Sequence, residues 1–119
     1  GITVPTFPNF YCMYGPGTDL AFGGSLILNG ECQIRYIMSC LQTLLQNKRR
    51  SLECKQSVFD DYYRRFRELH ARLVWEHDSI QSSFYQNADG KVTLLWPWRI
   101  LDMWEWTQAA NPDDYTIAD

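Results

Sequence analysis

The sequence predicts an α+β fold built from two long helices and a set of short strands. Two observations carry this prediction: apolar residues recur at helical spacing over 26–47 and 57–75, and short apolar runs elsewhere end at turn-forming residues. A length of 119 residues with 45% hydrophobic residues is typical of one globular domain. No repeat or linker divides the chain, so a single unit over 1–119 is expected.

The N-terminal part is expected to be a strand followed by a glycine-rich loop, together spanning 9–25. Residues 10–14 form a short apolar run that stops at Gly15-Pro16-Gly17, a pattern typical of a buried strand that ends at a turn. Residues 15–25 contain four of the seven glycines. This segment leads directly into the first helical pattern.

The helix predicted over 26–47 has an apolar face and a plausible cap. Gly24 or Ser25 can cap its N-terminus. A glycine inside a helix costs about 1 kcal/mol relative to alanine, so Gly30 indicates a close backbone approach. The residues expected on the buried face are Ile34, Ile37, Met38, Leu41, Leu44 and Leu45.

The C-terminal half is predicted to hold a second helix, a hairpin and a tryptophan-rich segment. A short strand at 52–55 precedes the helix 57–75, which starts at a capping box formed by Ser57 and Asp60. A hairpin over 83–95 would turn at Asp89-Gly90. The segment 96–119 begins with a short helix after Pro97 and carries most of the tryptophans.

Composition narrows the function classes. The net charge of −3 and the pI near 5.3 argue against a nucleic-acid partner, and no apolar run is long and unbroken enough to indicate a membrane span. The four cysteines lack the close spacing of a zinc site, so no metal is expected, and they are expected to be reduced thiols of a cytoplasmic protein. Aromatic residues make up 15% of the chain. Their large apolar surface must be covered by this chain or by a partner.

Two segments are candidates for a binding site, and each has a simpler structural interpretation. The glycine loop before the first helix would present free N–H groups and a positive dipole end to an anion or an electron-rich ligand edge. It matches neither phosphate-binding glycine motif, and a tight strand-to-helix turn would look the same. The run Trp96-Pro97-Trp98-Arg99 would line a pocket or an interface, or form a packed aromatic lid. No set of residues at catalytic spacing is present.

A series of short pieces along the chain matches one known family in both order and spacing. Those pieces are Pro8-Asn9-Phe10, Tyr14-Gly15-Pro16-Gly17-Thr18, Gly23-Gly24-Ser25-Leu26-Ile27, Glu31-Cys32-Gln33, Arg35-Tyr36-Ile37, Phe84-Tyr85-Gln86-Asn87, Gly90-Lys91-Val92, Pro97-Trp98-Arg99-Ile100, Asp102, Trp104, Thr107 and Asn111-Pro112-Asp113-Asp114-Tyr115. With these pieces the chain resembles the C-terminal part of a Baeyer–Villiger-type flavin-dependent monooxygenase of the 4-hydroxyacetophenone monooxygenase-like branch. The resemblance covers essentially the whole chain, and its specificity lies in the joint order of the pieces.

This resemblance implies the C-terminal portion of a Rossmann-like FAD-binding domain. The implied reaction depends on FAD and NADPH and inserts oxygen beside a ketone carbonyl, giving an ester, or oxidises a heteroatom. The nucleotide-binding motifs lie upstream in such enzymes, so this chain alone is expected to be inactive and to need the rest of the enzyme as its partner. Trp98 and Arg99 would be candidates for the wall of the substrate pocket or for a lid on the cofactor side. The residues implied on the flavin side are Thr18, Asp19, Leu20, Gly23, Gly24, Ser25 and Leu26.

Two positions depart from the family pattern, and another function class stays open. Asp19 stands where the family usually has Asn, and Phe22 where it often has His. An ionised Asp19 beside an anionic reduced flavin would be unfavourable unless it is paired or turned away.

The alternative function is a non-catalytic interaction module that binds a protein through Trp98, Trp104 and Trp106; a small-ligand carrier with an aromatic pocket is a third option.

Overall fold

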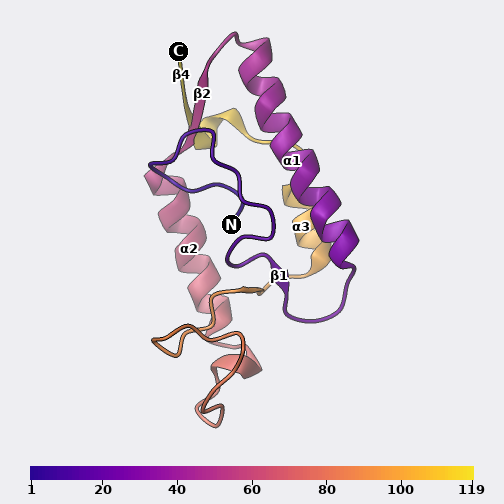
Figure 1. The fold of residues 1–119 in the computed structure, drawn as a ribbon, viewed down its shortest axis with the longest axis vertical. Coiled ribbons are helices and arrows are strands. Elements are labelled where there is room, and N and C mark those ends of the chain that lie inside the picture. The colour runs from indigo at the N-terminus through magenta and orange to yellow at the C-terminus, as the bar shows by residue number, and fades with distance from the viewer.

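Two helices of unequal length run along the molecule and set its elongated shape (Figure 1). The computed structural model describes residues 1–119, with extents of 52 × 27 × 19 Å. Helix α1 spans Leu26–Gln46 and helix α2 spans Gln56–His70. Two small sheets and a short third helix complete the chain, which confirms the predicted α+β class.

Helix α1 lies within one residue of the predicted 26–47, but a different face of it is buried. Ser25 is the N-cap, and its hydroxyl accepts a hydrogen bond from the Leu28 amide at 3.2 Å. The prediction of the core face is wrong at Ile34, Met38, Leu41 and Leu45, which are 38–78% exposed. The rest of the chain instead packs on the opposite face, whose buried residues are Asn29, Gly30, Cys32, Gln33, Cys40 and Leu44.

The predicted strand at 10–14 is not formed. Residues 13 and 14 lie in a turn, and the Cys12 amide donates to the Ile2 carbonyl rather than to a sheet. Phe10 and Met13 are 50% and 40% exposed. A strand needs a neighbouring strand to take its backbone hydrogen bonds, and the chain supplies none here. The first strand is β1, Asp19–Leu20, which pairs in parallel with β3, Leu95–Trp96.

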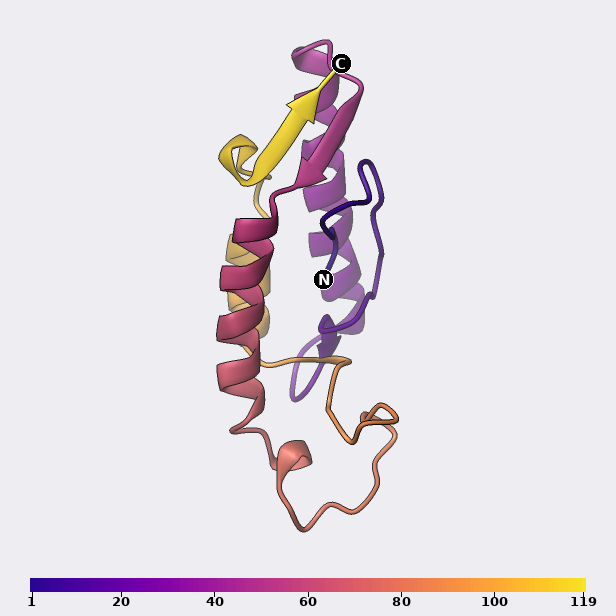
Figure 2. The same ribbon diagram turned by 90° about the vertical axis from the view of Figure 1, so that its left-hand side faces the viewer.

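An antiparallel ribbon forms one end of the molecule (Figure 2). Strand β2 spans Ser51–Cys54, one residue earlier than the predicted 52–55, and pairs with β4, Tyr115–Ala118, which the sequence did not predict. This ribbon packs on α1 to form the first core cluster, made of Cys40, Leu44, Leu52 and Tyr115.

Helix α2 is shorter than the predicted 57–75, and its predicted capping box at Ser57 is absent. Its N-cap is Lys55, without a side-chain hydrogen bond, and its last residue is His70. A turn follows and leads into the short helix η1, Val74–Glu76. The Glu76 carboxylate accepts hydrogen bonds from the Arg67 guanidinium at 3.0 Å and from the Val92 amide at 3.2 Å, which links this short helix to α2 and to the segment before β3.

The hairpin predicted over 83–95 is reduced to one isolated bridge between Gln86 and Val92. The Asn87 side chain accepts hydrogen bonds from the amides of Asp89 and Lys91, which holds the turn by local polar contacts. Residues 71–94 form a long loop beyond the end of α2 (Figure 2). This stretch lacks the alternating apolar face that would pin a longer ladder.

The short helix α3, Ile100–Trp106, begins after Pro97 as expected and packs on α1. Met103 of α3, Cys32 of α1 and Trp96 of β3 form the second core cluster. The 3₁₀ turn η2, Pro112–Asp114, then leads into β4.

The chain exposes more surface than a compact protein of its mass. Its accessible area is 7656 Å², against about 6,700 Å² expected for a 14.0 kDa monomer. Its radius of gyration is 15.3 Å, against about 13.5 Å expected. None of the three helices has both the length and the apolar character needed to cross a bilayer.

Candidate functional site

A buried polar network fixes the glycine loop against α1. The Asn29 side-chain amide donates to the Thr18 carbonyl at 2.7 Å, and the Gln33 amide donates to the Asn29 side-chain oxygen at 2.8 Å. The Gln33 oxygen in turn accepts from the Tyr14 backbone amide at 2.8 Å. Asn29 and Gln33 are fully buried and Thr18 is 2% exposed. This network sets the position of the loop relative to the first turns of the helix.

Two glycines permit close approaches around the same loop. A Cβ at Gly30 would lie 2.2 Å from the Tyr14 hydroxyl, which donates to the Leu26 carbonyl. The close approach that Gly30 indicated is therefore present. Gly17 has φ +76°, and a Cβ there would lie 2.7 Å from the ring of Phe66 on α2. The loop is thus held from both α1 and α2.

The N-terminus of α1 presents free backbone donors to solvent. The amides of Leu26 and Ile27 have no acceptor within the chain, and the first turn contains no acidic residue. A Cβ at Gly23 would meet nothing within 4 Å, so the surface beside this turn is open. Phe22 and Leu26 are 57% and 54% exposed. The positive end of the helix dipole therefore faces an open surface with apolar flanks.

The carboxylate of Asp19 is engaged locally. Its Oδ1 accepts from the Leu20 amide at 2.9 Å, and both residues are partly buried in β1. Pairing of β1 with β3 places Asp19 opposite Leu95 and Leu20 opposite Trp96.

The structure places Trp98 and Arg99 in different surroundings. Trp98 is partly buried and contacts Trp96, Trp106, Tyr62 and Phe66, with ring centroids 4.7–6.0 Å apart. This arrangement is a packed aromatic cluster.

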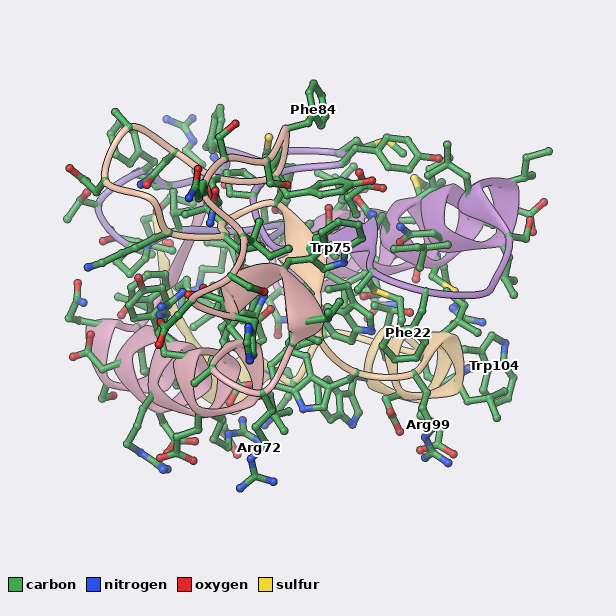
Figure 3. All side chains as sticks on the ribbon, turned by 90° about the horizontal axis from the view of Figure 1, so that it is seen from below. Phe22, Arg72, Trp75, Phe84, Arg99 and Trp104 are labelled. Atoms are coloured by element: carbon green, nitrogen blue, oxygen red, sulfur yellow. The ribbon has the colours of Figure 1, made fainter.

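Arg99 is exposed and projects away from the ribbon just before α3 (Figure 3). Its guanidinium binds the Asp102 carboxylate at 2.7 Å and holds the pKa of that carboxyl below its usual range. Ile100, the next residue, lies beside Gly24: its Cβ is 3.5 Å from where a Cβ of Gly24 would stand. The tertiary fold therefore brings the start of α3 to the glycine loop.

A cavity of about 530 Å³ lies between α2, α3, β4 and the N-terminal residues. Tyr62, Trp96 and Trp106 line its aromatic part, and Asp61 and Arg65 contribute charge. Neither Trp98 nor Arg99 lines it.

The alternative interaction surface was predicted to use three tryptophans. Two of them, Trp104 and Trp106, are 45% and 43% exposed.

The sequence did not single out Arg35, which ties α1 to α3. Its guanidinium donates to the carbonyls of Trp104 and Thr107 at 2.8 and 3.0 Å and lies 5.6 Å from the centre of the Trp104 ring. A cation at these carbonyls stabilises the C-terminal end of α3. Glu31 lies one turn before Arg35 in the sequence, so helical spacing predicts a local ion pair and gives no signal for this role.

The buried thiols and phenols of the first core cluster are poor nucleophiles. Burial raises the pKa of the Cys40 thiol to about 11 and that of Tyr11 to about 12. All four cysteines are free thiols. No group of three His, Cys, Asp or Glu residues is placed to bind a metal ion.

The chain is similar to monooxygenases of bacteria and fungi. It is 36% identical to an uncharacterized monooxygenase of Sinorhizobium fredii over 97% of the chain and 17% of that protein. It is 30% identical to a Baeyer–Villiger monooxygenase of Pseudomonas aeruginosa over 83% of the chain and 19% of that protein. It is 29% identical to an FAD-binding monooxygenase of Aspergillus niger over 82% of the chain and 16% of that protein.

These similarities cover most of the chain but only a small part of each relative. The chain spans about a fifth or less of the length of the relatives it matches. No protein-family model and no solved structure matches it. All three relatives are named monooxygenases, and the Aspergillus niger relative is named FAD-binding. The chain is therefore a region related to part of a flavin-dependent monooxygenase.

Proposed function

We propose that this chain completes the FAD site of a larger Baeyer–Villiger-type monooxygenase, with the glycine loop and the N-terminus of α1 facing the flavin. The observation that carries the proposal is the pair of free amides at Leu26 and Ile27 beside an open glycine loop. Such donors at a helix N-terminus stabilise negative charge. The names of the Pseudomonas aeruginosa and Aspergillus niger relatives support the reaction type and FAD.

The residues present fit the electron-rich edge of a flavin. No acidic side chain lies in the first turn of α1, and the Asp19 carboxylate accepts a hydrogen bond from the Leu20 amide. Gly23 leaves room for a ring to approach the backbone. The apolar side chains of Phe22 and Leu26 offer surface to an aromatic ring system. Two other flavin-side residues have a structural part: the Thr18 carbonyl accepts from Asn29 and holds the loop, and Ser25 caps the helix.

When bound, FAD would supply the redox and oxygen-activating chemistry. The chain's own part is to bind and orient the flavin: Leu26 and Ile27 donate to its electron-rich edge, and the Asn29–Gln33 network keeps the loop in register. The rest of the enzyme would bind NADPH. We place Trp98 and Arg99 near the substrate, a ketone or a compound with an oxidisable heteroatom, because Ile100 brings this segment beside Gly24.

A chimera tests the proposal. This chain replaces the matched region of the Sinorhizobium fredii monooxygenase, and the purified protein is assayed for bound FAD by absorbance and for its flavin reduction potential. Leu26→Glu places a carboxylate in the first turn, and Leu26→Gln is the uncharged control of the same shape. Glutamate suits a helix first turn, so the substitution does not weaken the helix.

We expect the Leu26→Glu chimera to have the more negative flavin potential. A repulsion of about 1 kcal/mol with the reduced flavin corresponds to about 20 mV for a two-electron couple. Equal potentials for the two variants would show that the α1 N-terminus does not face the flavin. A folded chimera that binds no FAD would contradict the cofactor assignment itself.

A further inference from the structure

The outer side of α1 carries an apolar face that no part of this chain covers. We call it the outer stripe: Ile27, Ile34, Met38, Leu41 and Leu45. At 100° per residue these five positions fall within about 60° of one another, opposite the side that holds Cys40 and the Asn29–Gln33 network. Exposure of their side chains runs from 38% at Leu41 to 78% at Leu45. The stripe extends about 27 Å along the helix.

A helix that is buried on one side and apolar on the opposite side is typical of one that lies between two layers. Helix α1 forms one long side of the molecule, with the rest of the chain on its inner side (Figure 1). The Tyr14 ring, 47% exposed, lies over Gly30 and extends the apolar face beside the stripe. None of the five stripe positions carries charge.

We infer that the outer stripe is the surface on which the remaining region of the monooxygenase packs. This inference rests on the proposed function. The matched relatives have more than four-fifths of their length outside the region similar to this chain, so a large partner region is available. The accessible area exceeds that of a compact monomer by about 950 Å², and a standard interface buries about 800 Å² on each side. The outer stripe contributes to this excess together with other exposed apolar residues such as Phe84.

Methionine oxidation tests the inference without any substitution in the stripe. Met38 is 49% exposed in this chain, whereas Met103 is 2% exposed. The chimera with the Sinorhizobium fredii monooxygenase is treated with hydrogen peroxide, native and urea-unfolded, and sulfoxide formation at each methionine is followed by mass spectrometry. We expect native Met38 to oxidise at least about tenfold more slowly than in the unfolded protein, as Met103 does.

A cysteine at the far end of the stripe provides the second probe. Alkylation of Leu45→Cys in the native chimera should be slowed by a similar factor, whereas Phe84→Cys, at a position 86% exposed, reacts as in the unfolded protein. Rapid reaction of both Met38 and Leu45→Cys in a chimera that binds FAD would overturn the docking surface and leave the cofactor proposal standing. Protection of both in a chimera without FAD would support the docking surface and refute the cofactor proposal.

A second copy of the chain is the competing occupant of the stripe. In that case the chimera would be a dimer, and the protection of Met38 would disappear on dilution to the monomer. That outcome would overturn the inference, whereas protection that does not depend on concentration supports it.

Discussion

Replacing Gln33 by glutamate should destabilise the chain in a way that depends on pH. Gln33 is fully buried, donates to the Asn29 side-chain oxygen and accepts from the Tyr14 amide, both at 2.8 Å. Gln33→Glu keeps the shape and the acceptor. It removes the donor and places a negative charge against the Asn29 oxygen, with no cation among the contacts of the network. Only the protonated carboxyl can donate to that oxygen.

The size of the effect follows from proton linkage. Burial raises the pKa of a carboxyl, by several units when the group is fully buried. The folded pKa then lies above the unfolded pKa of about 4.3. The unfolding free energy therefore decreases as the pH rises above about 4.3. If the carboxyl stays protonated at pH 7 in the folded chain, pH 7 lies about 2.7 pH units above the unfolded pKa. At 1.36 kcal/mol for each unit, the unfolding free energy falls by about 3.7 kcal/mol. We expect a loss of about 3 kcal/mol at pH 7 and less than about 1 kcal/mol at pH 4.

Urea unfolding followed by circular dichroism at pH 4, 5.5 and 7 measures this difference against the unmodified chain at each pH. Gln42→Glu is the matched control, because Gln42 is exposed on the same helix. It should change the unfolding free energy by less than about 0.5 kcal/mol at every pH. A loss for Gln33→Glu that is equal at pH 4 and pH 7 would refute the assigned network.

Three further predictions concern the contacts around the loop and α3. Gly17→Ala should lower the unfolding free energy by about 2 kcal/mol, because of φ +76° and the Phe66 ring, and a lower Tm would reveal it. Burial lowers the pKa of His70, so the unfolded chain takes up that proton first and stability should fall as the pH drops below about 6.5. His70→Gln should flatten this fall and the exposed His77→Gln should not, as urea unfolding between pH 5 and 8 would measure. Arg35→Lys should cost about 1–2 kcal/mol, because an ammonium cannot span both α3 carbonyls, and a red shift of tryptophan emission would accompany it.

Local signals in the sequence predicted the start of α1 and its approach to the loop. A serine before an apolar helical pattern caps the helix, and the structure has Ser25 at that position. Gly30 indicated a close approach, and the Tyr14 hydroxyl occupies the space of the missing side chain. The flavin-side assignment of this segment and the placement of Trp98 and Arg99 at a substrate remain predictions.

Elements that depend on distant partners were predicted poorly. The run 10–14 has the composition of a strand, but the chain offers it no neighbouring strand. Helix α2 ends at His70, and beyond it Glu76 is held by Arg67 and the Val92 amide, contacts that helical spacing does not encode. Strand β4 forms because β2 is there to pair with it.

The sequence by itself determined where α1 runs, how it is capped and that the loop before it is tight, because these depend on residues within a few positions of one another. Only the tertiary structure decided which side of α1 is buried. An apolar stripe in the sequence indicates that one face of a helix will be buried, but not by which segment. In this chain the other segments pack on the face of α1 that carries Asn29, Gln33 and Cys40. The polar residues of that side could be buried because the loop supplied the Thr18 carbonyl and the Tyr14 amide as partners.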